Sequence, residues 1–166
     1  MKTQKLTVKD TLINVRYTET DGPPIVFVHG NSAGSFAFEK QLEGEPGEKY
    51  RCIALDLPGH GDSDNAADSD IYSMPGYAEI VAGVAEQMNA TDGIFVGWSL
   101  GGHIVLEAAD ALSNAKGFLI FGTPPLGKPP AMEASFLPHP SNGVLFNPEL
   151  SDEEIRAFAA SQMKPD

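Results

Sequence analysis

The chain has 166 residues, of which 42% are hydrophobic and 20% are charged, and this composition predicts a globular protein rather than a disordered one. It carries 11 Lys and Arg against 23 Asp and Glu, and the resulting net charge of −12 argues against nucleic acids and anionic membranes as partners. The sequence has no apolar run that could span a bilayer, no signal peptide after Met1 and a single cysteine, so we expect a cytoplasmic protein without an intrachain disulfide.

Apolar runs separated by turn residues predict strands that alternate with helices along the chain. The continuous apolar runs are typical of parallel strands buried on both faces, and Cys52 lies in one of them as a predicted core residue. In chain order we expect strands at 6–8 and 12–17, joined as a hairpin near Lys9 and Asp10, then strand 25–28, helix 36–42, strand 52–55, helix 73–88, strand 93–96, helix 100–112 and strand 118–121.

This alternation predicts an α/β protein with a doubly wound, mostly parallel sheet. Ligands of such sheets bind at the carboxyl ends of the strands, which is where Asn31, Asp56 and Ser99 fall.

The composition changes after Gly122, because residues 123–140 contain six prolines and cannot continue a sheet. A capping box at Ser151 predicts a further helix near the end of the chain. We therefore divide the chain into a core, residues 1–122, and the start of a helical cap, residues 123–166.

Ser99 is the candidate nucleophile. It lies in the sequence Gly-Trp-Ser-Leu-Gly at residues 97–101, between a predicted strand and a predicted helix. A serine held between glycines on a sharp strand-to-helix turn is typical of a nucleophile that attacks a carbonyl carbon, because the crowded turn has no room for side chains beside it. The alternative interpretation is a serine that caps the following helix.

Backbone N–H groups are the expected donors to the oxyanion. One donor is predicted at Leu100, the residue after the nucleophile, and the other at Asn31, in the small-residue loop that follows strand 25–28. The Asn31 side chain can also be a simple turn former. Asn31 and Trp98 are the candidate substrate contacts. No His-x-His or HExxH pattern predicts a metal site.

The general base is not evident from the sequence. His103, four residues into the nucleophile helix, is predicted to pack beside the turn, whereas His29 and His60 are expected to bond backbone groups and shape their own loops. His139, between two prolines, remains the alternative base. Four carboxylates near the predicted last helix are expected to form a solvated face and a helix start: Glu149, Asp152, Glu153 and Glu154.

Five motifs in this chain resemble those of α/β-hydrolase-fold N-acyl-homoserine lactonases, quorum-quenching enzymes that open the lactone ring without a metal. The motifs run in the same order over about residues 10–125, while the cap segment 126–166 matches poorly. They are HGNS at 29–32, DLPGHGDS at 56–63, YSMPGY at 72–77, GWSLGGH at 97–103 and GTPP at 122–125.

The resemblance implies an α/β-hydrolase fold that needs no cofactor. It also implies two further strands, an acid and a histidine beyond the cap, so we expect this chain to stop about 80–100 residues short of a complete hydrolase of roughly 250 residues. The predicted strand 118–121 would then be an open sheet edge. We expect this edge to pair with a second chain or a second copy, or to make the isolated chain poorly soluble.

We accordingly predict a serine hydrolase that opens a lactone or an ester, with an N-acyl-homoserine lactone as the first candidate substrate. The isolated chain is expected to be nearly inactive, because a serine without a base is a weak nucleophile. The alternatives are a carboxylesterase, a cofactor-free perhydrolase of the haloperoxidase type, and a non-catalytic protein that uses the hydrolase pocket to bind a ligand.

Overall fold

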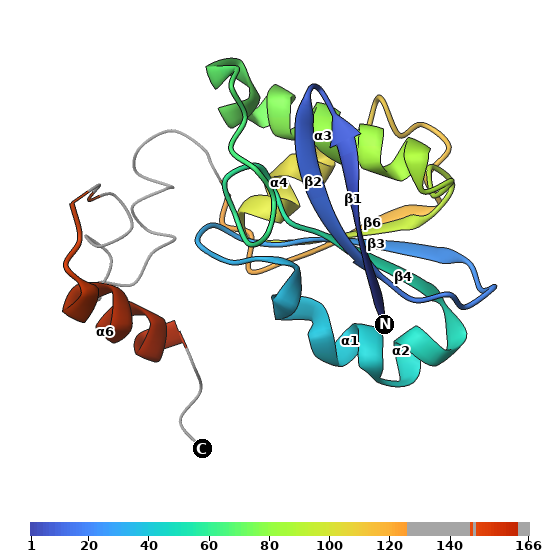
Figure 1. The fold of residues 1–166 in the computed structure, drawn as a ribbon. Helices are drawn as coiled ribbons and strands as arrows, with labels where there is room; N and C mark the ends of the chain where they lie inside the picture. The colour runs from blue at the N-terminus through green and yellow to red at the C-terminus, as the bar shows by residue number, and fades with distance from the viewer. Residues whose placement is uncertain (126–146, 148, 163–166) are drawn as a thin grey trace. The chain divides into compact units, whose positions relative to one another are not determined.

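The computed structural model describes residues 1–125, 147 and 149–162 (Figure 1). Its internal contacts divide the chain into two compact units, Met1–Thr123 and Pro124–Asp166. This boundary lies next to the division predicted from the sequence, and the interpretation of the second unit as the start of a cap stays a prediction. None of the helices within the described residues is both long and apolar enough to cross a membrane.

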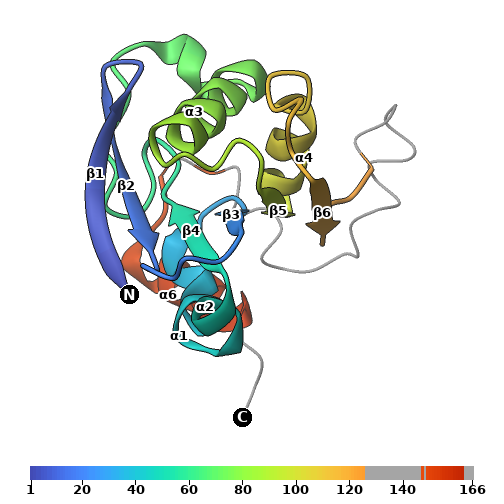
Figure 2. The same cartoon turned by 90° about the vertical axis from the view of Figure 1, so that its right-hand side faces the viewer.

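The first unit contains a six-stranded sheet in the order β1-β2-β4-β3-β5-β6, which Figure 2 shows from its side. The hairpin β1–β2 is antiparallel and pairs antiparallel with β4, whereas β4, β3, β5 and β6 are parallel to one another. The predicted mostly parallel sheet is thus confirmed. The strands are β1 (Lys2–Val8), β2 (Thr11–Tyr17), β3 (Pro24–Val28), β4 (Arg51–Leu55), β5 (Ile94–Trp98) and β6 (Gly117–Phe121).

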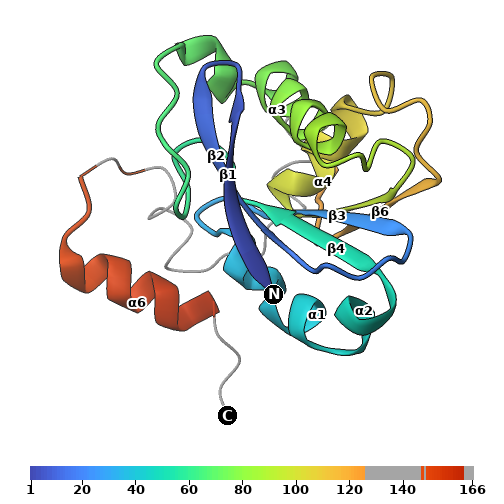
Figure 3. The same cartoon turned by 45° about the vertical axis from the view of Figure 1, so that its right-hand side comes forward.

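Helices cover both faces of this sheet, so the predicted doubly wound architecture is also confirmed (Figures 1 and 3). Helices α3 and α4 lie on one face, and α1 and α2 lie on the other. The helices of the described residues are η1 (Ser35–Phe38), α1 (Glu39–Glu43), α2 (Glu45–Lys49), η2 (Ser69–Tyr72), α3 (Met74–Gln87), α4 (Leu100–Glu107) and α6 (Asp152–Gln162).

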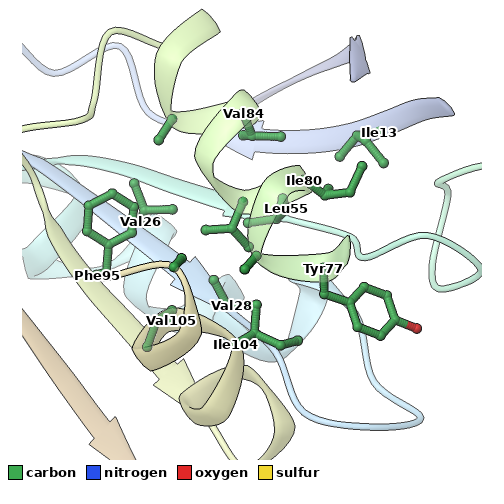
Figure 4. Packing of buried hydrophobic residues seen from close by; sticks show 14 of the residues in the cluster. Ile13, Val26, Val28, Leu55, Tyr77, Ile80, Val84, Phe95, Ile104 and Val105 are labelled. Carbon is green, nitrogen blue, oxygen red and sulfur yellow. The ribbon is translucent and has the colours of Figure 1, made fainter. Parts of the chain in front are cut away.

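The larger hydrophobic core lies between the sheet and helices α3 and α4 (Figure 4). Alternate residues of each buried strand face it, so Val26 and Val28 belong to this core, whereas Phe27 belongs to the smaller core under α1. Cys52 is fully buried in the smaller core, as expected. Both faces of the central strands are buried, and this packing holds the carboxyl ends of the strands in place.

Two helix boundaries differ from the prediction. The helix expected over 36–42 is a 3-10 turn, η1, followed by α1. Helix α2 lies where the sequence analysis placed no element, although its sequence contains Pro46 and Gly47, which favour turns. A proline is accepted in the first turn of a helix, where its missing N–H has no intrahelical partner.

The helix expected over 100–112 ends at Glu107. Beyond this residue the backbone tightens, since the Ala109 N–H donates to the Leu106 carbonyl, an i to i+3 bond. Leu112 is still buried in the core. The apolar residues therefore keep a helical spacing up to Leu112, although residues 108–114 form turns, and the predicted helix is too long for this reason.

Two predicted helix starts are confirmed by their capping bonds. The Ser73 hydroxyl accepts from the Gly76 N–H at 3.1 Å at the start of α3. At the start of α6 the Ser151 N–H donates to Glu154 Oε2 at 2.9 Å, while the Glu154 N–H donates to the Ser151 hydroxyl at 3.3 Å.

Candidate active site

Ser99 lies between a strand and a helix, as the sequence predicted, but β5 runs on to Trp98, so Ser99 is the single residue between β5 and α4. Its backbone has φ 52° and ψ −116°, a conformation that non-glycine residues rarely adopt and that occurs where the surrounding structure imposes it. The hydroxyl makes no capping hydrogen bond to α4, although the residue occupies the capping position. The Ser99 side chain is half-buried, and its conformation is not that of an ordinary helix-capping serine.

The glycines around Ser99 are required by close packing. A Cβ on Gly97 would collide with the carbonyl of Gly101, and a Cβ on Gly101 would collide with the carbonyl of Val28. Strand β5, helix α4 and the end of β3 are therefore packed backbone to backbone, which fixes the sharp turn at Ser99.

The backbone of Ser99 is also held from the side of β6. Its N–H donates to the Phe121 carbonyl at 3.0 Å, and its carbonyl accepts from the Thr123 hydroxyl at 3.2 Å. The same hydroxyl lies 3.2 Å from the Phe121 carbonyl. Thr123 was not singled out as a functional residue, and its only signal in the sequence is the GTPP motif at 122–125.

The loop after β3 reaches Ser99 at Gly30. An ideal Cβ on Gly30 would lie 3.0 Å from Ser99 Cβ and 3.3 Å from the Trp98 carbonyl oxygen. Asn31 follows directly and is exposed, and within the described residues its N–H donates to no backbone carbonyl. Leu100 begins α4, so its N–H has no intrahelical acceptor. The two predicted oxyanion donors thus lie on the two segments that border Ser99.

His29 is completely buried at the end of β3. Its Nδ1 donates to the Gly30 carbonyl at 2.7 Å, and its Nε2 accepts from the Leu57 N–H at 3.0 Å, so the ring is neutral with the proton on Nδ1. Burial lowers the pKa of His29 from 6.5 to about 4. Because both nitrogens bond the backbone, the imidazole shapes two loops, as expected from the sequence, and is not free to act as a base.

Asp56 is buried at the end of β4, and its carboxylate accepts three hydrogen bonds from separate segments. They come from the Ser35 N–H at the start of η1, from Asn14 Nδ2 on β2 at 2.8 Å and from the Asp62 N–H at 3.0 Å. Burial by itself would raise the pKa of the carboxyl group, but these bonds outweigh it and hold the pKa below its usual value. Asp56 is therefore an ionised anchor for the loops around the site.

The remaining histidines give no base among the described residues. His60 donates from Nδ1 to the Pro58 carbonyl at 3.1 Å and shapes its own loop, as expected. His103 lies on α4, and its buried Nε2 has no hydrogen-bond partner in the described part of the chain. None of the described histidines bonds Ser99, and His139, the alternative base, lies outside the described residues.

Trp98, a candidate substrate contact, ends β5 and is half-buried. Its indole packs beside Gly122, where a Cβ would lie 3.2 Å from the ring. The carboxylates Asp152, Glu153 and Glu154 form the first turn of α6, as predicted. Among residues 1–125 and the described part of the second unit, no three His, Cys, Asp or Glu side chains come together to hold a metal ion.

Comparison with known sequences identifies the family. Residues 25–164 match the sequence profile of the alpha/beta hydrolase family. The chain belongs to this α/β hydrolase family. Two curated proteins are similar to this chain in sequence. A pimeloyl-(acyl-carrier protein) methyl ester esterase of Methylococcus capsulatus is 34% identical over 153 residues, and a non-heme chloroperoxidase of Streptomyces lividans is 32% identical over 109 residues.

Among solved structures, this chain is similar to the N-acyl homoserine lactonase AidH in complex with N-butanoyl homoserine, with a TM-score of 0.88 and 38% sequence identity. The match covers 97% of this chain and 59% of that chain. The resemblance to lactonases of this fold, stated from the motifs, is thereby confirmed. The chain spans 55% of the length of the esterase and 39% of the length of the chloroperoxidase.

Proposed function

We propose that this hydrolase uses Ser99 as the nucleophile that opens a lactone or an ester, with an N-acyl-homoserine lactone as the preferred substrate. The observation that carries the proposal is the backbone of Ser99, which has a positive φ of 52° on a one-residue turn with no capping bond from its hydroxyl. The similarity to the AidH lactonase over 97% of the chain supports the choice of substrate.

In this proposal the Ser99 Oγ attacks the ring carbonyl carbon, and the carbonyl oxygen becomes an oxyanion held by the N–H groups of Leu100 and Asn31. Collapse of the tetrahedral intermediate breaks the bond to the ring oxygen, which takes up a proton and stays tethered as a hydroxyl group. Water then hydrolyses the acyl-enzyme to the open hydroxy acid and restores the Ser99 hydroxyl. Trp98 borders the nucleophile and is the proposed substrate contact.

Both steps need a base that takes the Ser99 proton and returns it. Because the described histidines do not bond Ser99, we propose that the base comes either from His139 or from a polypeptide segment outside these 166 residues. A fluorophosphonate probe distinguishes the two. Labelling of Ser99 in this chain, lost in His139→Ala, assigns the base to His139, whereas no labelling assigns it to another segment.

The nucleophile is tested in a chimera that joins this chain to the part of the AidH lactonase that it does not cover, called the AidH chimera below. We expect the AidH chimera to open N-butanoyl-homoserine lactone and expect Ser99→Ala to lower kcat by at least about 10³-fold. Ser113→Ala, which changes an exposed serine in a turn, is the matched control and should leave kcat unchanged. Equal rates for Ser99→Ala and the parent would remove Ser99 from the mechanism.

Ester hydrolysis is the second candidate function, because a methyl ester esterase is 34% identical to this chain over 153 residues. The perhydrolase alternative has a relative in the chloroperoxidase. A panel of the lactone, p-nitrophenyl acetate and acetate with hydrogen peroxide, compared by kcat/KM in the AidH chimera, ranks the three activities. A protein that only binds these ligands would show saturation without turnover.

A further inference from the structure

His29 bonds the Gly30 carbonyl, and this carbonyl belongs to the same peptide group as the Asn31 N–H, the proposed oxyanion donor. Its Nδ1–H donates to the Gly30 carbonyl at 2.7 Å, and that carbonyl shares a planar peptide group with the Asn31 N–H. No described peptide bond is cis. In a trans peptide the C=O and the N–H point in opposite directions, so a carbonyl drawn toward the buried ring turns the N–H away from it.

We propose that His29 is a positioning residue that orients the Asn31 N–H toward the oxyanion by holding the Gly30 carbonyl on the opposite side of their shared peptide plane. The inference rests on the proposed function, which makes the Asn31 N–H an oxyanion donor. His29 does not touch the substrate and acts only through the peptide.

The ring is fixed for this task by its second nitrogen. Nε2 accepts from the Leu57 N–H at 3.0 Å, directly after the end of β4, so the proton of the neutral ring must lie on Nδ1, where it bonds Gly30. Complete burial excludes water as a competing partner for either nitrogen. The same burial disfavours the charged ring, which would place a second proton against the Leu57 N–H.

The other end of the same loop is held independently. The Ser35 N–H donates to Asp56, and Asp56 lies one residue before Leu57. The loop between Gly30 and Ser35 is therefore tied at both ends to the segment that follows β4. Near its start, the loop passes so close to Ser99 that a Cβ on Gly30 would lie 3.0 Å from Ser99 Cβ. Among the described residues, no hydrogen bond other than that of His29 reaches the peptide group of Gly30 and Asn31, and this bond sets the direction of the Asn31 N–H.

Two substitutions separate the two nitrogens of His29. In His29→Asn the side-chain amide lies near the position of Nδ1 and can donate to the Gly30 carbonyl, but it leaves the Leu57 N–H without its acceptor. In His29→Gln the amide lies near the position of Nε2 and can accept from Leu57, but it leaves the Gly30 carbonyl without its donor. A merely structural role would make both variants lose the same properties.

The test uses the full 166-residue chain and has two readouts, the ¹⁵N order parameter of the Asn31 N–H and the hydrogen exchange rate of the Leu57 amide. His29→Gln is expected to lower the Asn31 order parameter from about 0.85 to below about 0.6 with Leu57 still protected. His29→Asn is expected to keep Asn31 ordered and to speed Leu57 exchange at least about tenfold. Equal changes at Asn31 in both variants would overturn the proposal.

The same pair is then measured in the AidH chimera. His29→Gln should lower kcat about 10²- to 10³-fold with KM within about threefold of the parent, the loss expected for one oxyanion donor, whereas His29→Asn should stay within about tenfold. A parent chimera that unfolds cooperatively in urea and is nevertheless inactive would contradict the proposed function alone, because the order parameters of Asn31 still decide whether His29 sets its peptide. Equal losses of kcat in the two variants would contradict the positioning role.

Discussion

Gly30 and Ser99 belong to loops that follow different strands, and they meet because β3 and β5 are neighbours that end at the same level, with Val28 paired to Gly97. The separation of 3.0 Å between an ideal Cβ on Gly30 and Ser99 Cβ is tighter than ordinary van der Waals contact. The backbone of Gly30 is not in the left-handed region, so the reason for a glycine is space alone. That space lets the backbone of the loop after β3 pack against Ser99, the proposed nucleophile.

We therefore predict that Gly30→Ala displaces Ser99, the proposed nucleophile, without unfolding the protein. The added methyl group must push Ser99 or the loop by a few tenths of an ångström, and small misplacements at a reacting centre cost up to about 10²-fold in rate. We expect kcat of the AidH chimera to fall about 10- to 100-fold. Urea denaturation should show a loss of no more than about 1 kcal/mol.

The control is Gly117→Ala at the start of β6, where an added Cβ meets nothing within 4 Å. It should leave both kcat and stability close to those of the parent. If Gly30→Ala retained the parental kcat, Gly30 would not be limiting the approach of the loop to Ser99.

At the scale of elements, the Asp56 side chain bonds three separate segments of the chain. Its carboxylate joins β2 through Asn14, η1 through Ser35 and the segment after β4 through Asp62. The Ser63 hydroxyl adds a bond of 2.7 Å to the Asp56 carbonyl, and the Asn14 N–H donates to that hydroxyl at 2.8 Å. A charged acceptor suits this position because every partner is a donor.

Replacing the Asp56 carboxylate should destabilise the loops at the carboxyl ends of the strands, where the candidate site lies. In Asp56→Asn an NH₂ group replaces one carboxylate oxygen and faces N–H groups that need an acceptor. We therefore expect a loss of about 3 kcal/mol or more in the free energy of unfolding. Urea denaturation at pH 7 measures it. Asp62→Asn changes an exposed side chain whose backbone N–H makes the bond, and it should stay within about 0.5 kcal/mol of the parent. Similar losses for both variants would contradict the role of the Asp56 carboxylate.

The difference between Ser99 and Asp56 shows what the sequence could predict. The turn at Ser99 is encoded locally, because an apolar strand, two glycines and a helix all lie within about a dozen residues. The network at Asp56 depends on Asn14, a polar residue inside a strand 42 positions away, and nothing local marks that pairing. Likewise Thr123 meets the Ser99 carbonyl only because β6 pairs with β5. Contacts across the sheet need the strand order, which the sequence alone does not provide.

At the scale of the whole molecule, β6 is the edge of the sheet in the described residues and pairs only with β5. Four consecutive apolar side chains of this strand are 36 to 52% exposed: Phe118, Leu119, Ile120 and Phe121. The strand carries no lysine, proline or bulge of the kind that protects natural sheet edges. Its free backbone groups and apolar side chains together form a surface suited to pairing with a further strand.

We predict that the 166-residue chain self-associates through this edge or binds a second polypeptide there. Light scattering after size exclusion should give a mass above 17.7 kDa that rises with concentration. Leu119→Lys places a charge on the most exposed residue of β6 and should shift the chain toward the monomer. Leu106→Lys, at a residue of similar exposure on α4, is the control and should leave the mass unchanged. A monomeric parent chain at all concentrations would contradict the prediction, because an unprotected apolar edge would then be stable in water.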